Sequence, residues 1–157
     1  MHQTLVQWYQ WAIFILPWFL LIFLDKNKVK RYMPVTLLSI VLVLLCVQLG
    51  RNLGWFYVTP SIVLFNGASA YSFGVFAVGT LFIFYFTFKR FWLYFVTNLV
   101  LDIFQIFVVR PFNIKLGLEK EGSFTNWQTI MLMTFIALLL YGYQLWQDDV
   151  MQKWKVN

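Results

Sequence analysis

The sequence predicts an all-α integral membrane protein, a bundle of five transmembrane helices with its N-terminus outside and its C-terminus inside. Hydrophobic residues make up 61% of the 157-residue chain and charged residues only 11%. A soluble domain carries about 25% charged residues, so this composition is typical of a membrane protein. The apolar residues fall into five runs of about twenty residues, long enough to cross a bilayer, with short basic clusters between them.

The first span is expected at about residues 5–24. Trp8, Tyr9 and Trp11 at its start are typical of the aromatic belt at a membrane interface. Pro17 removes a backbone hydrogen bond and predicts a bend. No basic residue precedes this run and no small-residue cleavage pattern follows it, so we do not expect a signal peptide.

The second span is expected at 34–52, after a basic loop at Asp25–Arg31. Pro34 suits the first turn of a helix, where its missing N–H is not needed. The lipid bilayer is therefore the expected partner, and the loop supplies cations for anionic lipid head groups. These cations are Lys26, Lys28, Lys30 and Arg31.

The third span is expected at 68–88, and its start has two interpretations. Asn66-Gly67 is typical of a turn, so Ser61–Phe65 forms either a short interfacial piece or the start of one long tilted helix. We favour the short piece. Small residues such as Gly74 and Gly79 would allow another helix to approach closely here.

The fourth span is expected at 91–109 and the fifth at 127–146. Only Lys89-Arg90 separates the third and fourth spans, which predicts an antiparallel hairpin. Aromatic and aliphatic residues continue at helical spacing beyond the fifth span. We therefore expect the tail at 147–157 to remain helical and to lie along the inner interface. The whole chain, 1–157, is predicted to be one transmembrane domain.

The orientation follows from the basic residues, which concentrate on the cytoplasmic side of membrane proteins. With the N-terminus outside, the inner segments hold Lys26, Lys28, Lys30, Arg31, Lys89, Arg90, Lys153 and Lys155. The outer segments hold only Arg51, Arg110, Lys115 and Lys120. We therefore expect a multi-pass protein of a cell membrane.

One carboxylate lies inside a predicted span and forms the candidate site. Asn98, Asp102 and Gln105 are spaced four and then three apart, so they share one helix face. A buried charge in hydrocarbon costs several kcal/mol unless it is paired or neutralised. By depth, Gln48 and Arg51 of the second span would complete the polar cluster if spans two and four are neighbours. Arg110 is the alternative counter-charge.

The sequence indicates neither a metal site nor a cofactor. Cys46 is the only cysteine and His2 the only histidine, too few to ligate a metal ion together. No phosphate-binding glycine loop and no nucleophile–base set occurs, so we do not expect an enzyme. The net charge of +6 comes from short clusters between apolar runs, which favours lipid head groups over nucleic acid.

Three stretches carry a resemblance to a known family. They are Phe91-Trp-Leu-Tyr-Phe-Val-Thr-Asn-Leu-Val-Leu-Asp102, Tyr141-Gly-Tyr-Gln-Leu-Trp-Gln147 and the basic segment that ends in Arg31-Tyr-Met-Pro34. They resemble segments of an uncharacterised family of small five-pass membrane proteins from Bacillus-type Gram-positive bacteria. The resemblance implies a bacterial plasma membrane and carries over no catalytic or binding residue.

Two functions are compatible with this pattern. The favoured one is a non-enzymatic helical scaffold or accessory subunit, whose partners are other membrane proteins or further copies of itself. The alternative is a transport component for a proton, an ion or a small polar solute that uses the Asp102 cluster. Towards the inner face the fourth span offers only Thr97 and Tyr94, which favours the scaffold. A polar row on the third span facing Asp102 would favour transport.

Overall fold

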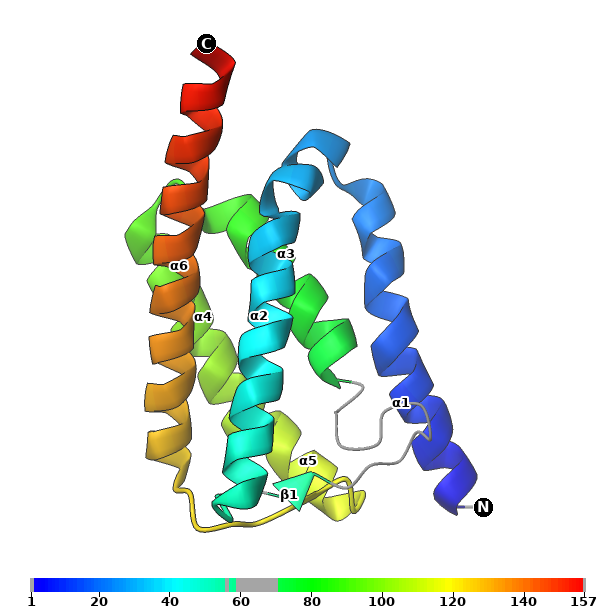
Figure 1. Cartoon of the computed structure of the whole chain (residues 1–157). Helices are drawn as coiled ribbons and strands as arrows, with labels where there is room; N and C mark the ends of the chain where they lie inside the picture. Colours follow the sequence, from blue (N-terminus) through cyan, green and yellow to red (C-terminus); the bar gives the residue numbers. More distant parts are fainter. Residues whose placement is uncertain (1, 56, 59–70, 157) are drawn as a thin grey trace.

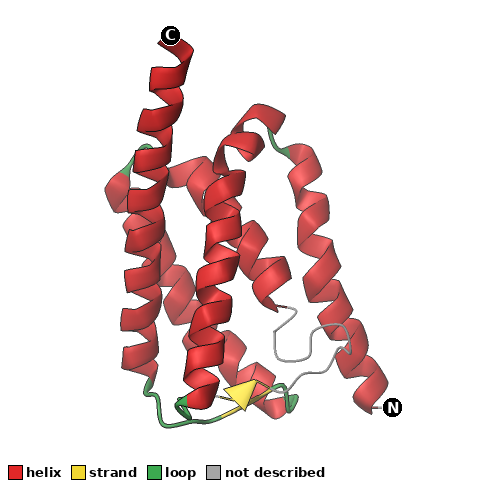
Figure 2. Ribbon diagram, viewed as in Figure 1, coloured by secondary structure: helices red, strands yellow, loops and turns green. Residues whose placement is uncertain are grey.

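The computed structural model describes residues 2–55, 57–58 and 71–156 (Figure 1). Of these residues 86% are helical, in five helices (Figure 2). The first helix is α1 (His2–Phe19), followed by a 3₁₀ turn at Leu20–Phe23, and the second is α2 (Lys26–Asn52). The third consists of the π-helix η3 (Ser72–Phe76) and α3 (Ala77–Thr87). The fourth consists of α4 (Phe91–Phe104), the π-helix η4 (Gln105–Val109) and α5 (Arg110–Lys115), and the fifth is α6 (Asn126–Val156). The strands are β1 (Tyr57–Val58) and β2 (Glu119–Lys120).

In the described part of the chain, three helices are long and apolar enough to cross a membrane, namely Lys26–Asn52, Phe91–Lys115 and Asn126–Met151. Gln7–Phe23 and Ser72–Thr87 are apolar but shorter. The predicted all-helical class is confirmed, and three of its helices could cross a membrane by their length and composition. The alternative starts of the third span at Ser61–Phe65 lie outside the described residues.

The second helix begins earlier than the sequence indicated. Asp25 caps it, because its carboxylate accepts hydrogen bonds from the backbone N–H groups of Asn27 and Lys28 at 2.8 and 3.2 Å. The basic segment is therefore the first turns of α2 and not a loop, and Pro34 lies inside the helix. The strong cap outweighs the expectation drawn from the proline.

The fourth helix also exceeds its predicted end at Arg110-Pro111. It continues without a break through η4 and α5 to Lys115, and Pro111 falls in the first turn of α5. A proline clashes with the carbonyl of the preceding turn of a regular helix. The π-helical turn includes Phe107, whose carbonyl Pro111 would meet in a regular helix, and it widens the backbone there.

The helices alternate in direction, so the two termini lie at opposite ends of the bundle (Figure 1). α2 packs on α3 and α6, while α4 packs on α3 and α6. Among the described residues, α2 and α4 are not one of the extensively packed helix pairs, contrary to our prediction for spans two and four, and α3 and α6 each pack on both. α3 and α4 form the predicted hairpin, and α6 extends past the other helices to Val156.

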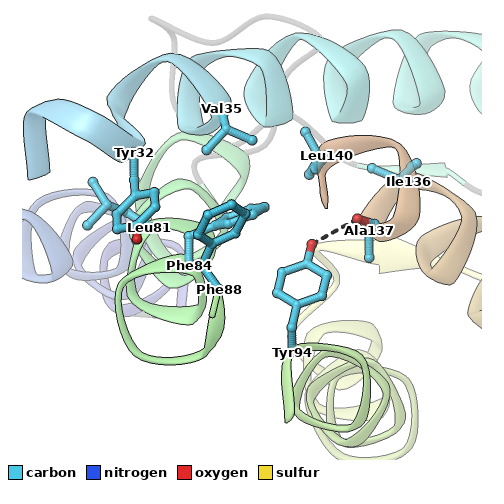
Figure 3. Close-up of a cluster of buried hydrophobic side chains, with 9 residues drawn as sticks. All are labelled: Tyr32, Val35, Leu81, Phe84, Phe88, Tyr94, Ile136, Ala137 and Leu140. Atoms are coloured by element: carbon cyan, nitrogen blue, oxygen red, sulfur yellow. Dashed lines mark hydrogen bonds between the residues drawn. The ribbon is translucent and has the colours of Figure 1, made fainter. Parts of the chain in front are cut away.

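We call the end that holds the start of α2, the α3–α4 connection and the C-terminal part of α6 the basic end. An aromatic core lies near it and joins four helices (Figure 3). Phe84 packs against Tyr32 and Tyr94, with ring centroids 6.1 and 4.9 Å apart. The Tyr94 hydroxyl donates a 2.8 Å hydrogen bond to the carbonyl of Ala137 and so ties α4 to α6.

An ion pair completes the packing of the basic end. Arg31 binds Asp148 through two hydrogen bonds, and its Nε lies 2.9 Å from Oδ1. Gln144 donates to the same carboxylate at 3.1 Å, and Gln147 donates to the Arg31 carbonyl at 3.1 Å. These contacts join the first turns of α2 to α6.

The opposite end is closed by β1 and β2, and we call it the strand end. The strands pair antiparallel, with Tyr57 opposite Lys120. Trp55 stacks on Phe124 at 4.5 Å, and Ser123 donates through both its N–H and its hydroxyl to the Gly54 carbonyl at 3.0 Å. These contacts connect the segment after α2 to the segment before α6.

α1 packs against η3 through a close backbone contact. A Cβ added to Gly74 would lie 2.1 Å from the Ile13 carbonyl oxygen, so only glycine fits there. Gly79 differs, because no atom lies within 4 Å of its added Cβ. The close approach that we expected of this small-residue segment therefore occurs at Gly74 and not at Gly79.

An acidic cavity inside the helix bundle

A partly open cavity of about 450 Å³ lies between the helices, and residues from every helix from α1 to α6 except α5 line it. Most of its wall is aliphatic or aromatic. α2 contributes Val43, Cys46 and Val47, and α6 contributes mainly Leu, Ile and Met side chains. Tyr94 and Phe84 belong both to this wall and to the aromatic core, so the core closes the cavity towards the basic end.

The structure places Asn98, Asp102 and Gln105 in the wall of this one cavity. Their spacing puts them on the face of α4 and η4 that points into the bundle. Asn98 donates from Nδ2 to the Tyr94 carbonyl at 2.9 Å. Gln105 accepts a 2.8 Å hydrogen bond from the Tyr71 hydroxyl. Two of the three side chains thus have partners within the protein.

Asp102 has a different environment. Its Oδ2 atom is buried and accepts no hydrogen bond from any residue that the structure describes. None of the described residues in the cavity wall is basic, and Asp102 is the only charged one among them. A buried polar atom without a partner costs about 1–3 kcal/mol and calls for an explanation.

The other predicted members of the cluster lie elsewhere. Gln48 is exposed and does not line the cavity, although its neighbours Cys46 and Val47 do. One further residue on a helix turns a side chain by about 100°, which takes Gln48 off the inward face. Arg51 is not part of the wall either. Depth along the helix was a poor guide because it ignores this rotation.

Arg110 does not act as the counter-charge of Asp102. Its Nη1 donates to Asn126 at 2.8 Å, and its charge acts on Glu119. Burial raises the pKa of Glu119, while the charge of Arg110 and a hydrogen bond from Asn113 oppose that increase. The interactions of Arg110 are therefore with residues at the strand end of the bundle, namely Asn126 and Glu119.

Tyr71, at the start of η3, is the site residue that the sequence reasoning missed. It lines the cavity, binds Gln105 and lies within electrostatic range of both Asp102 and Glu119. Polar side chains therefore continue from Asp102 towards the strand end. The sequence signal for Tyr71 is weak, because the chain has 8 tyrosines and the interfacial belt accounts for such residues.

No protein-family model matches this chain, and no curated protein or solved structure shows significant similarity to it. The resemblance to the five-pass Bacillus-type family therefore stays a prediction. Among the described residues no cluster of three His, Cys, Asp or Glu side chains could hold a metal ion. What the site offers chemically is one carboxylate in a largely apolar cavity with a few hydrogen-bonding groups.

Proposed function

We propose that this protein binds a small, largely apolar solute in its intramembrane cavity, as a component of solute movement across a membrane. The observation that carries the proposal is the buried Oδ2 of Asp102, which faces no hydrogen-bond donor from the described residues. If Asp102 only held helices together, a polar group of a neighbouring helix would meet it. The structure shows no such contact for Asp102 Oδ2 among the described residues, which speaks against the scaffold or accessory function that the sequence favoured.

The cavity supports the same proposal. Protein interiors are close-packed, and a void forfeits contacts that a purely structural bundle would keep. Binding sites for small molecules have volumes of about 300–1,000 Å³ and apolar walls with a few polar groups. The cavity of about 450 Å³, with Asn98, Asp102, Gln105 and Tyr71 in its wall, has this character.

A polar residue of the third span supports transport over a scaffold. Tyr71 lies at the N-terminal end of η3 and meets Gln105 across the cavity. From the sequence we favoured a scaffold because the fourth span offers only Thr97 and Tyr94 towards the inner face, and we expected a polar row on the third span to favour transport. Tyr71 supplies one polar residue of that kind. With Tyr71 and Glu119, polar groups extend from Asp102 to the strand end, while the aromatic core blocks the basic end.

We propose five passes through a bacterial plasma membrane, with the strand end outside and the basic end inside. The termini at opposite ends of the bundle support an odd number of passes. Lys26, Lys28 and Lys30 are exposed at the basic end and available to anionic lipid head groups. Arg31 is engaged by Asp148, so it is not a free cation for that role.

Cysteine labelling tests this orientation. In a Cys46→Ala background, a cysteine at exposed Glu121 should react with a membrane-impermeant thiol reagent on intact cells, and one at exposed Asn27 should not. The reverse pattern would overturn the orientation. Labelling at both positions would overturn the odd number of passes between them.

Filling the cavity tests the binding function. Gly79 lines the cavity and has open space around an added side chain, whereas Gly142 is exposed on α6 and equally unhindered. Purified protein in nanodiscs should bind the neutral fluorophore N-phenyl-1-naphthylamine above the level of empty nanodiscs. We expect Gly79→Leu to abolish this binding and Gly142→Leu to retain it. Equal binding by the two variants would reject the cavity as a binding site and favour the scaffold.

A further inference from the structure

We propose that the cavity selects organic cations, with the carboxylate of Asp102 as the anchor for one positively charged group. This inference rests on the proposed binding function and names its ligand class. The ligand would carry an ammonium or other onium centre on an apolar body. The carboxylate would neutralise the charge, and the aliphatic wall from α2 and α6 would receive the body.

The charge pattern of the wall supports a cation. Asp102 is the one charged side chain among the described lining residues, and its buried Oδ2 has no donor from them. An anion would meet this carboxylate with no compensating base. A neutral molecule could supply a donor, but only a cation would also offset the negative charge in surroundings of low dielectric constant.

Aromatic rings in the same wall point to an organic cation. Tyr71, Phe76 and Tyr94 line the cavity together with Asp102. The faces of aromatic rings attract cations, and sites for quaternary ammonium groups are built from such rings. The Tyr71 hydroxyl donates to Gln105, and the Tyr71 ring lies beside that of Phe76, with the ring centroids 6.5 Å apart.

A bare inorganic ion fits the site poorly. Hard cations need many oxygen ligands: Ca²⁺ takes about six to eight, and Mg²⁺ takes about six. Besides Asp102, the described wall supplies side-chain oxygens only from Asn98, Gln105 and a few hydroxyl groups, and the Gln105 oxygen already accepts from Tyr71. A cation that carries its own apolar body loses less hydration on entry and gains contact with the apolar wall.

The test uses two probes of the same shape and opposite charge, tetraphenylphosphonium and tetraphenylborate. Binding is measured by equilibrium dialysis with protein in nanodiscs of zwitterionic lipid, so that anionic lipid does not attract the cation. We expect saturable binding of tetraphenylphosphonium to the wild type and none of tetraphenylborate. Asp102→Asn keeps the shape of the side chain and should weaken cation binding by at least about tenfold.

The neutral fluorophore separates the two proposals. If Asp102→Asn still binds N-phenyl-1-naphthylamine, the variant is folded and its loss of cation binding supports the anchor. Unchanged tetraphenylphosphonium binding by Asp102→Asn, or equal binding of both ions, would overturn the cation inference. Gly79-dependent binding of the neutral probe would leave the proposed function standing in that case. If Gly79→Leu and Gly142→Leu bind the neutral probe equally, the proposed function itself fails.

Discussion

The two carboxylates inside the helical part of the bundle, Asp148 and Asp102, have opposite surroundings. Asp148 accepts from Arg31 and Gln144, and its side chain is 12% exposed. Asp102 lines a cavity, and its Oδ2 accepts from no described residue. The ion pair of Asp148 therefore holds α2 and α6 together at the basic end, whereas no described residue donates a hydrogen bond to Oδ2 of Asp102.

The same contrast applies to packing. At the basic end, Tyr32, Phe84 and Tyr94 fill the space between helices with stacked and tilted rings. Phe84 and Tyr94 form the boundary between this packed core and the cavity, because they belong to both. Substitutions should therefore lower stability most at the basic end and change ligand binding most around Asp102.

The largest expected effect is the loss of a core side chain. Leu81 is 0% exposed and does not line the cavity, so Leu81→Ala should cost about 2–5 kcal/mol of unfolding free energy. Met133 lines the cavity, and Met133→Ala should cost clearly less because that side chain already borders a void. Equilibrium unfolding in mixed micelles measures both. Equal losses would mean that the two regions are packed alike.

A second comparison concerns the two glycines of the third span. Gly74→Ala brings a Cβ against the α1 backbone and should cost about 1–3 kcal/mol through overpacking. Gly79→Ala meets no atom within 4 Å and should be neutral or slightly stabilising, because alanine favours a helix. Thermal unfolding compares the pair. A tolerated Gly74→Ala would show that α1 does not depend on this contact.

Substitution by asparagine should lower the stability of the protein at Asp148 but not at Asp102. Asp148→Asn removes the ion pair with Arg31, which is 36% exposed, and should cost about 1–2 kcal/mol after allowance for solvent screening. Asp102→Asn removes a charge with no described partner and should not destabilise the protein. The same unfolding assay decides between them. A large loss for Asp102→Asn would indicate a structural role and weaken the contrast.

The smallest effect is expected at Glu119. Burial raises its pKa in the folded state, so the ionised form disfavours folding as the pH rises through that pKa. Glu119→Gln should therefore raise the unfolding temperature slightly at pH 7. At pH 4 the gain should shrink, because the native carboxyl is then largely protonated. A gain that is independent of pH would assign the effect to packing instead.

The sequence by itself determined the helical class, the three long apolar helices and the inward face of α4. These features depend on local periodicity, because apolar runs and the spacing of Asn98, Asp102 and Gln105 act within one helix. The start of α2 also depends on a local contact, the Asp25 cap, which our sequence analysis did not include.

Only the tertiary structure decided which side chains meet between helices. Arg31 and Asp148 are 117 residues apart in the sequence, and Tyr71 and Gln105 are 34 residues apart. Such pairs depend on helix rotation and on the choice of neighbouring helices. An apolar run does not encode these, because lipid and protein are equally good solvents for its side chains. For the same reason Gln48 matched Asp102 in depth and yet faces away from the cavity.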